Sequence, residues 1–171
     1  MNSMLKLTQS ILIIAIMVAY SAIAQETRVE SYPSNRLLDR QILLHVPEKR
    51  ATGLLVLLPA GNVHSYDEQS GYTPSTLPKL LAANGVVTLI AAPRPGRGAG
   101  VGLYAADAIL EELDGLIADE LGKFKIPADK VAIGGFSAGG IGAVRYAQFC
   151  RTHPDSLNHS RNFCSVVTSV A

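Results

Sequence analysis

The residues whose types and spacing could do chemistry are centred on one serine flanked by glycines. Residues 135–139 read Gly-Phe-Ser-Ala-Gly, with Ser137 in the middle. The aliphatic run at 131–133 predicts a strand before the serine, and the segment from Ala138 onward predicts a helix after it. The serine would then occupy a sharp corner between strand and helix, with its Oγ exposed. A hydroxyl in that position is suited to nucleophilic attack on an ester or amide carbonyl.

The neighbours of this serine support that interpretation. A strained corner needs small residues two positions before and two after the serine, and Gly135 and Gly139 meet this demand. A helix that starts at Ala138 directs its unpaired N–H groups and its positive dipole end toward the reacting carbonyl. The backbone N–H of Ala138 is therefore the expected first donor to the oxyanion.

A glycine-rich nucleotide loop is the main competing interpretation. The chain contains no Gly-x-x-x-x-Gly-Lys-[Ser/Thr] motif, and neither 134–142 nor 96–102 fits Gly-x-Gly-x-x-Gly. Dinucleotide sites also follow the first strand of their fold, whereas Ser137 follows roughly the fifth expected strand. The sequence therefore favours a catalytic serine, and we predict neither a cofactor nor a metal ion.

Strand and helix patterns alternate along the chain. Two extended segments come first and are expected to form an antiparallel edge hairpin. The later aliphatic runs indicate strands with both faces covered, and the apolar spacing between them indicates amphipathic helices. We therefore predict an α/β fold with a doubly wound, mostly parallel sheet and helices on both faces. The expected strands are 27–31, 41–46, 54–58, 86–91, 130–134 and 164–170. The expected helices are about 76–84, 103–121 and 138–150. The second helix carries acidic residues that are expected on its solvated face: Glu111, Glu112, Asp114 and Asp119.

With this serine and these elements, the chain resembles α/β-hydrolase-fold enzymes, both secreted esterases and the catalytic domains of prolyl-oligopeptidase-type peptidases. The resemblance covers residues 28–171 and stops after about the sixth strand of the family's fold. It implies a second oxyanion donor from the loop after the third strand, the backbone N–H of Gly61 or Asn62. In that loop, Tyr66 is either a further donor, as in the peptidase branch, or a surface tyrosine. His64 either faces the site or, as we expect, lies in solvent.

A serine nucleophile also needs a base and an acid, and in this family an acid and then a histidine follow the serine. The candidates after Ser137 are His153, Asp155 and His159. A helix over 138–150 would carry the chain about 18 Å from the serine, so we expect these three in a solvated connector. The resemblance places the usual acid and histidine after strands beyond Ala171. The apolar, strand-like run at the end of the chain also suggests an incomplete domain.

The first 24 residues have the features of an export signal. Lys6 precedes the apolar run 11–19, and the small residues Ala22 and Ala24 suggest cleavage after Ala24. The alternative is a membrane anchor, but an apolar run of about fourteen residues is shorter than the roughly twenty that span a bilayer. We therefore expect an exported protein, periplasmic or secreted, with one domain over residues 25–171 and no membrane contact after cleavage.

Charge and cysteine content limit the partners and the redox chemistry. The net charge of +1 and the mixed signs provide no basic face for nucleic acid, so a small-molecule ester or peptide is the expected substrate. Oxidising conditions outside the cytoplasm would permit a disulfide between Cys150 and Cys164. Such a bridge would close about fourteen residues and contribute about 3 kcal/mol in the chain-entropy model. Two buried thiols are the alternative.

The leading hypothesis from the sequence is a serine hydrolase of carboxylic esters, inactive or weak as this chain because the base and acid are missing. An exported setting suggests acetylated or aromatic-acylated carbohydrate as substrate. One alternative is a serine peptidase of the prolyl-oligopeptidase type. Another is a non-catalytic binding protein, in which Arg94 and Arg97 contact an anionic ligand.

Overall fold

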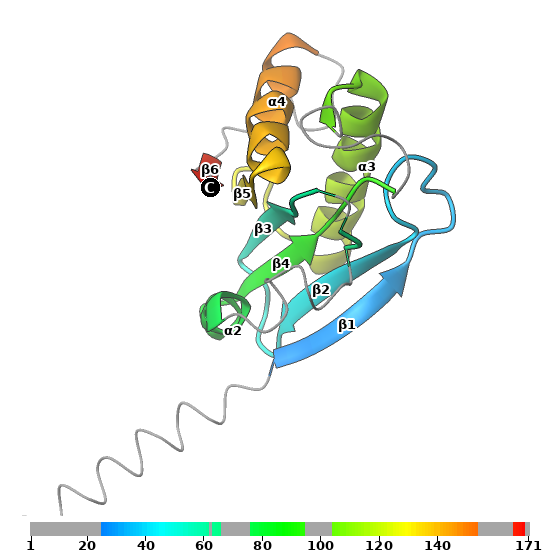
Figure 1. Ribbon diagram of the computed structural model, residues 1–171. Coiled ribbons are helices and arrows are strands. Elements are labelled where there is room, and N and C mark those ends of the chain that lie inside the picture. Colours follow the sequence, from blue (N-terminus) through cyan, green and yellow to red (C-terminus); the bar gives the residue numbers. More distant parts are fainter. Residues whose placement is uncertain (1–24, 62, 66–75, 95–103, 154–165, 170–171) are drawn as a thin grey trace, which may run out of the picture.

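The computed structural model describes residues 25–61, 63–65, 76–94, 104–153 and 166–169 (Figure 1). The expected export signal and its cleavage site lie outside these residues. A six-stranded sheet has the order β1-β2-β4-β3-β5-β6. In chain order the elements are β1 (Gln25–Ser31), β2 (Gln41–Pro47), β3 (Gly53–Leu58), α2 (Thr76–Ala83), β4 (Val86–Ile90), α3 (Asp107–Phe124), β5 (Val131–Phe136), α4 (Ala138–Thr152) and β6 (Val166–Ser169).

The strand pairings confirm the expected edge hairpin and parallel sheet. Strands β1 and β2 pair antiparallel, and β2 also runs antiparallel to β4. The pairs β3–β4, β3–β5 and β5–β6 are all parallel. The carboxyl ends of β3, β4, β5 and β6 therefore meet at one edge of the sheet, where ligands bind in open α/β folds.

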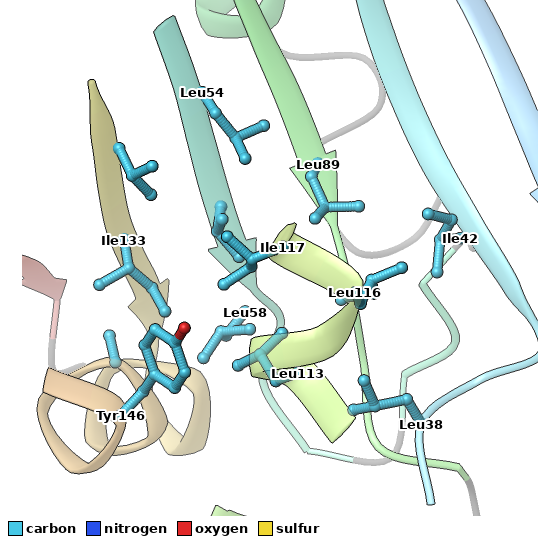
Figure 2. Packing of buried hydrophobic residues seen from close by; sticks show 14 of the residues in the cluster. Leu38, Ile42, Leu54, Leu58, Leu89, Leu113, Leu116, Ile117, Ile133 and Tyr146 are labelled. Carbon is cyan, nitrogen blue, oxygen red and sulfur yellow. The ribbon is translucent and has the colours of Figure 1, made fainter. Parts of the chain in front are cut away.

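Two hydrophobic layers cover the two faces of this sheet. Alternate residues of β3 explain the layers, because Leu54, Val56 and Leu58 belong to one cluster, whereas Leu55 and Leu57 belong to the other. Helices α3 and α4 cover the first face, and α2 packs on the other side against β2 and β4 (Figure 1). In Figure 2, Leu113, Leu116 and Ile117 of α3 point toward Leu54, Leu58 and Leu89 of the sheet. Burial of each such side chain contributes about 1.5–3 kcal/mol.

The prediction for the long middle helix was wrong at its start and on part of its polar face. Helix α3 begins at Asp107 rather than near 103. The Glu112 carboxylate accepts hydrogen bonds from the backbone N–H groups of Arg36, Leu37 and Leu38, at 2.9, 3.0 and 3.0 Å. Asp114 is buried and accepts a 2.7 Å hydrogen bond from the Tyr146 hydroxyl. These two acids therefore join α3 to neighbouring segments, whereas Glu111 and Asp119 are exposed as predicted.

A third acid of α3, Glu120, is buried against the edge hairpin. Its side chain is 0% exposed, and its Oε2 lies 3.5 Å from Lys123 Nζ. Lys123 also pairs with Glu30 of β1, which in turn pairs with Arg28. Burial raises the pKa of Glu120 to about 7, and the nearby Lys123 ammonium only partly opposes this rise.

This raised pKa predicts that the fold loses stability as pH rises. A Glu120 pKa of 4.5 in the unfolded chain and about 7 in the fold means that the folded state binds more protons between these values. Glu120→Gln mimics the protonated acid. Its advantage in unfolding free energy over the native chain should therefore grow by about 2–3 kcal/mol when the pH is raised from 5 to 8. Urea denaturation at both pH values measures this difference. The control Glu111→Gln, on the exposed face of the same helix, should show no such gain, and equal behaviour of the two variants would contradict the assignment.

Candidate active site

Ser137 occupies the corner between β5 and α4. Strand β5 ends at Phe136, and α4 begins at Ala138. Ser137 has φ 53° and ψ −118°, and a positive φ is strained for a residue with a side chain. The side chain is exposed and makes no capping hydrogen bond to α4. The backbone strain thus holds the Ser137 hydroxyl away from the helix and open to solvent.

Glycines are required around this corner because three backbone segments meet there. A Cβ atom on Gly135 would lie 2.6 Å from the Leu58 carbonyl oxygen at the end of β3. A Cβ atom on Gly139 would lie 2.7 Å from the Pro59 carbonyl oxygen, and closer still to that of Leu58. Real Cβ contacts do not reach these distances, so the first turn of α4 packs directly on the end of β3 only with glycine at both positions.

The oxyanion donors expected from the sequence lie at the same edge of the sheet as Ser137. Strands β3 and β5 pair with Leu58 opposite Gly135, so the loop after β3 starts beside the serine corner. Gly61, three residues beyond Leu58, has a left-handed φ of 61° and is exposed. The N–H groups at the start of α4, beginning with Ala138, have no partner within the helix. Asn62 lies outside the described residues.

Tyr104 links this loop to α4 and was not singled out in the sequence. It precedes α3, is fully buried, and its hydroxyl donates a hydrogen bond of 3.4 Å to the Pro59 carbonyl oxygen. Its ring lies so close to Gly142 that a Cβ atom there would come within 2.5 Å of Tyr104 Cγ. The tyrosine therefore fixes the chain before Gly61 relative to α4. The Gly at position 142, one turn after the corner, was the only sequence signal for this contact.

His64 is not the solvated histidine that the sequence suggested. Its ring is half-exposed, and its Nδ1 lies 3.3 Å from Oδ1 of the buried Asp39. Because a carboxylate only accepts, Nδ1 must be the donor in this bond. Asp39 Oδ2 accepts from the Ser65 N–H at 2.7 Å and from the Ser65 hydroxyl at 3.2 Å. The Ser65 Oγ in turn accepts from the Ala92 N–H at 2.7 Å, so the loop after β3 is tied to the ends of β2 and β4.

The Asp39–His64 pair is on the wrong side of β3 to act as the base of Ser137. Asp39 directly precedes β2, and the sheet order places β4 and β3 between β2 and β5. At about 4.8 Å per strand, the start of β2 lies about 14 Å from the serine corner. We therefore place the pair beside the start of β2, on the far side of β4 from Ser137.

The histidine and acid candidates after Ser137 do not complete a triad in the described residues. His153 follows the last turn of α4, at the opposite end of the helix from Ser137. It is half-buried rather than solvated, because its ring stacks on Phe149 with centroids 4.2 Å apart. The other predictions on this part of the chain, and several elsewhere, fall on residues outside the described structure: Asp155, His159, Tyr66, Arg97 and Cys164.

Two further sequence expectations concern cysteine chemistry and metals. Cys150 is buried in α4, and no finding tests whether it forms the possible bridge to Cys164 or stays a buried thiol. No group of three histidine, cysteine or acidic side chains in the described residues could hold a metal ion. Within the same residues, no helix is both long and apolar enough to cross a membrane.

The fold is shared with solved ester hydrolases. The chain superimposes on EstE1, a thermostable carboxylesterase cloned from a metagenomic library, with TM-score 0.57 and 19% identity over 90% of this chain and 49% of that one. An acetyl xylan esterase from Aspergillus awamori gives 0.54 and 16% over 88% and 52%. A putative carboxylesterase from Lactobacillus plantarum gives 0.57 and 15% over 84% and 57%. No protein-family model matches the sequence, and no curated protein is significantly similar to it.

These likenesses, the sheet order and the serine corner define the class of the structure. The chain has the α/β-hydrolase fold, as the sequence predicted, and its structural neighbours are carboxylic ester hydrolases. It spans about half the length of those neighbours.

The tight corner predicts a large cost for one added methyl group. Gly139→Ala should destabilise the fold by at least about 2 kcal/mol, because a Cβ there overlaps the end of β3. Gly115→Ala is the matched control, since nothing lies within 4 Å of a Cβ at that position of α3. The control should gain about 0.5–1 kcal/mol from helix propensity. Thermal and urea unfolding of both variants measure the contrast, and equal stabilities would refute the close packing.

Proposed function

We propose that this chain belongs to a serine hydrolase of carboxylic esters, with Ser137 as nucleophile. The observation that carries the proposal is the strained backbone of Ser137, at φ 53°, on a corner that only glycine neighbours permit. Strain of this kind persists only where the surrounding structure enforces it, and it concentrates at functional sites. The ester hydrolases among the similar structures support the same reaction class.

The reaction would proceed through an acyl-enzyme. A base removes the proton of Ser137 Oγ as the oxygen bonds to the carbonyl carbon, and the resulting oxyanion accepts hydrogen bonds from the N–H of Ala138 and that of Gly61 or Asn62. Collapse of this intermediate breaks the ester bond, and the departing alcohol takes the proton. Water then attacks the acyl group by the same route and releases the acid.

The base is the missing partner in the described residues. His45 is buried in β2 beside the Thr27 hydroxyl, His64 is bonded to Asp39, and His153 lies at the far end of α4. Asp155 and His159 are expected far from Ser137, because the helix over 138–150 carries the chain about 18 Å away from it. We therefore infer that this chain does not itself supply the histidine and the acid, and that it hydrolyses esters weakly or not at all.

The export signal, the substrate class and the two alternative functions stay predictions, and we include them in this proposal. Residues 1–24 would direct export, which makes acylated carbohydrate a reasonable substrate class, and one structurally similar protein is an acetyl xylan esterase. A serine peptidase would use the same residues, but the similar structures favour esters. A non-catalytic binding protein would lack a reactive serine.

Chemical rescue tests the proposal. A fluorophosphonate probe should label Ser137 slowly, and exogenous imidazole should raise that rate about tenfold, a small part of what a positioned base contributes. Mass spectrometry of the labelled peptide locates the adduct, with Ser137→Ala as the blank and Ser34→Ala as the control for an exposed serine elsewhere. p-Nitrophenyl acetate should be hydrolysed no faster by the native chain than by Ser137→Ala when imidazole is absent.

Two results would overturn parts of this account. No adduct on Ser137, with or without imidazole, would exclude the nucleophile and favour a binding protein. A clear Ser137-dependent hydrolysis without imidazole would show that a base is already present in the chain.

A further inference from the structure

An open pocket lies beside the Asp39–His64 pair. Its volume is about 590 Å³, in the range of small-molecule sites. The lining side chains come from the ends of several strands rather than from one element: Ser31, Asp39, Arg40, Gln41, His64 and Arg94. Ser31 ends β1, Gln41 begins β2, and the loops after β3 and β4 carry His64 and Arg94.

The charge that a ligand would meet in this pocket is positive. Asp39 is the single acid of the lining, but it is 4% exposed, and both carboxylate oxygens are engaged by Ser65 and His64. Arg40 is exposed, and Arg94 is half-buried. Two arginines thus line the pocket, whereas its single carboxylate is buried and already hydrogen-bonded. Guanidinium groups bind oxyanions through paired N–H donors.

The arginine side of the pocket is held rigidly. The Arg94 backbone N–H donates to the Leu37 carbonyl at 2.7 Å, and its Nη2 donates to the Asn35 carbonyl at 2.5 Å. The Asp39 N–H donates to the Ala92 carbonyl at 2.9 Å, and Leu38 pairs with Pro93. This segment is further clamped by Glu112, so the pocket walls require little ordering when a ligand binds.

The pocket and Ser137 lie along one edge of the sheet. Arg94 and His64 follow the carboxyl ends of β4 and β3, and Ser137 follows that of β5. The start of β2, beside the pocket, is three strand spacings from β5, or about 14 Å. One elongated substrate could therefore place its ester at Ser137 and a second polar group at the arginines.

We propose that this pocket binds a carboxylate carried by the ester substrate, about 10–15 Å from the carbonyl that Ser137 attacks. The inference rests on the proposed ester hydrolase function. A singly charged carboxylate fits better than a phosphate dianion, because the buried Asp39 lies in the same wall and repels added negative charge. The substrate class is then an acidic ester, such as the monoester of a long dicarboxylic acid.

Calorimetric titration of the full chain with two matched probes tests this assignment. Monomethyl dodecanedioate, whose single carboxylate lies about 14 Å from the ester carbonyl in the extended chain, should bind at least about tenfold more tightly than the uncharged dimethyl dodecanedioate. Arg94→Gln and Arg40→Gln should each abolish most of this preference, and the exposed Arg40 serves as the variant least able to disturb folding. Arg151→Gln, an exposed arginine at the end of α4, is the control and should leave both affinities unchanged.

The alternative outcomes separate this proposal from the reaction itself. Ser137→Ala should bind monomethyl dodecanedioate as tightly as the native chain, so binding without serine reactivity would reject the hydrolase and keep the pocket. Reactivity of Ser137 with equal affinity for the two esters, or with no binding of either, would reject the pocket and keep the hydrolase. Inorganic phosphate binding more tightly than the monoester would also overturn the carboxylate assignment.

Discussion

The direct contact of α4 and β5 with the end of β3 is the constraint on which the site depends. Two glycines without side chains allow the first turn of the helix to rest on the Leu58 and Pro59 carbonyls. That contact holds Ser137 at a positive φ of 53° and leaves its side chain exposed. It also brings the helix N-terminus beside the loop that holds Gly61. The proposed nucleophile, the proposed oxyanion donors and the backbone strain therefore have one common cause.

The sheet and the serine corner could be predicted from the sequence because local signals determine them. Aliphatic runs such as 54–58 and 86–91 fall within one residue of β3 and β4, and the glycine spacing around Ser137 reports a backbone requirement directly. The helix boundary at Asp107 was less visible, because the apolar spacing continues to Ala106, which lies at the N-cap just before the helix. An apolar spacing alone does not show at which residue a helix begins.

The polar contacts could not be predicted, because they join residues far apart in the chain. The Glu112 carboxylate accepts hydrogen bonds from the backbone N–H groups of 36–38, and the Asp39 carboxylate accepts from His64 and Ser65. Nothing in the neighbouring sequence distinguishes these acids from the exposed Glu111 and Asp119. Each of these contacts depends on the sheet order, which places the partner residue nearby. The pocket beside Arg94 therefore follows from the topology of the sheet and has no sequence motif.

The geometry of a covalent adduct tests the central claim most directly. A crystal structure of the chain after reaction with a fluorophosphonate would show a tetrahedral phosphorus on Ser137 Oγ. The account predicts that its non-bridging oxygen lies 2.7–3.1 Å from the backbone nitrogen of Ala138, the range of oxyanion-hole hydrogen bonds. An oxygen that points to solvent, away from the start of α4, would contradict the assignment of this corner as a catalytic site.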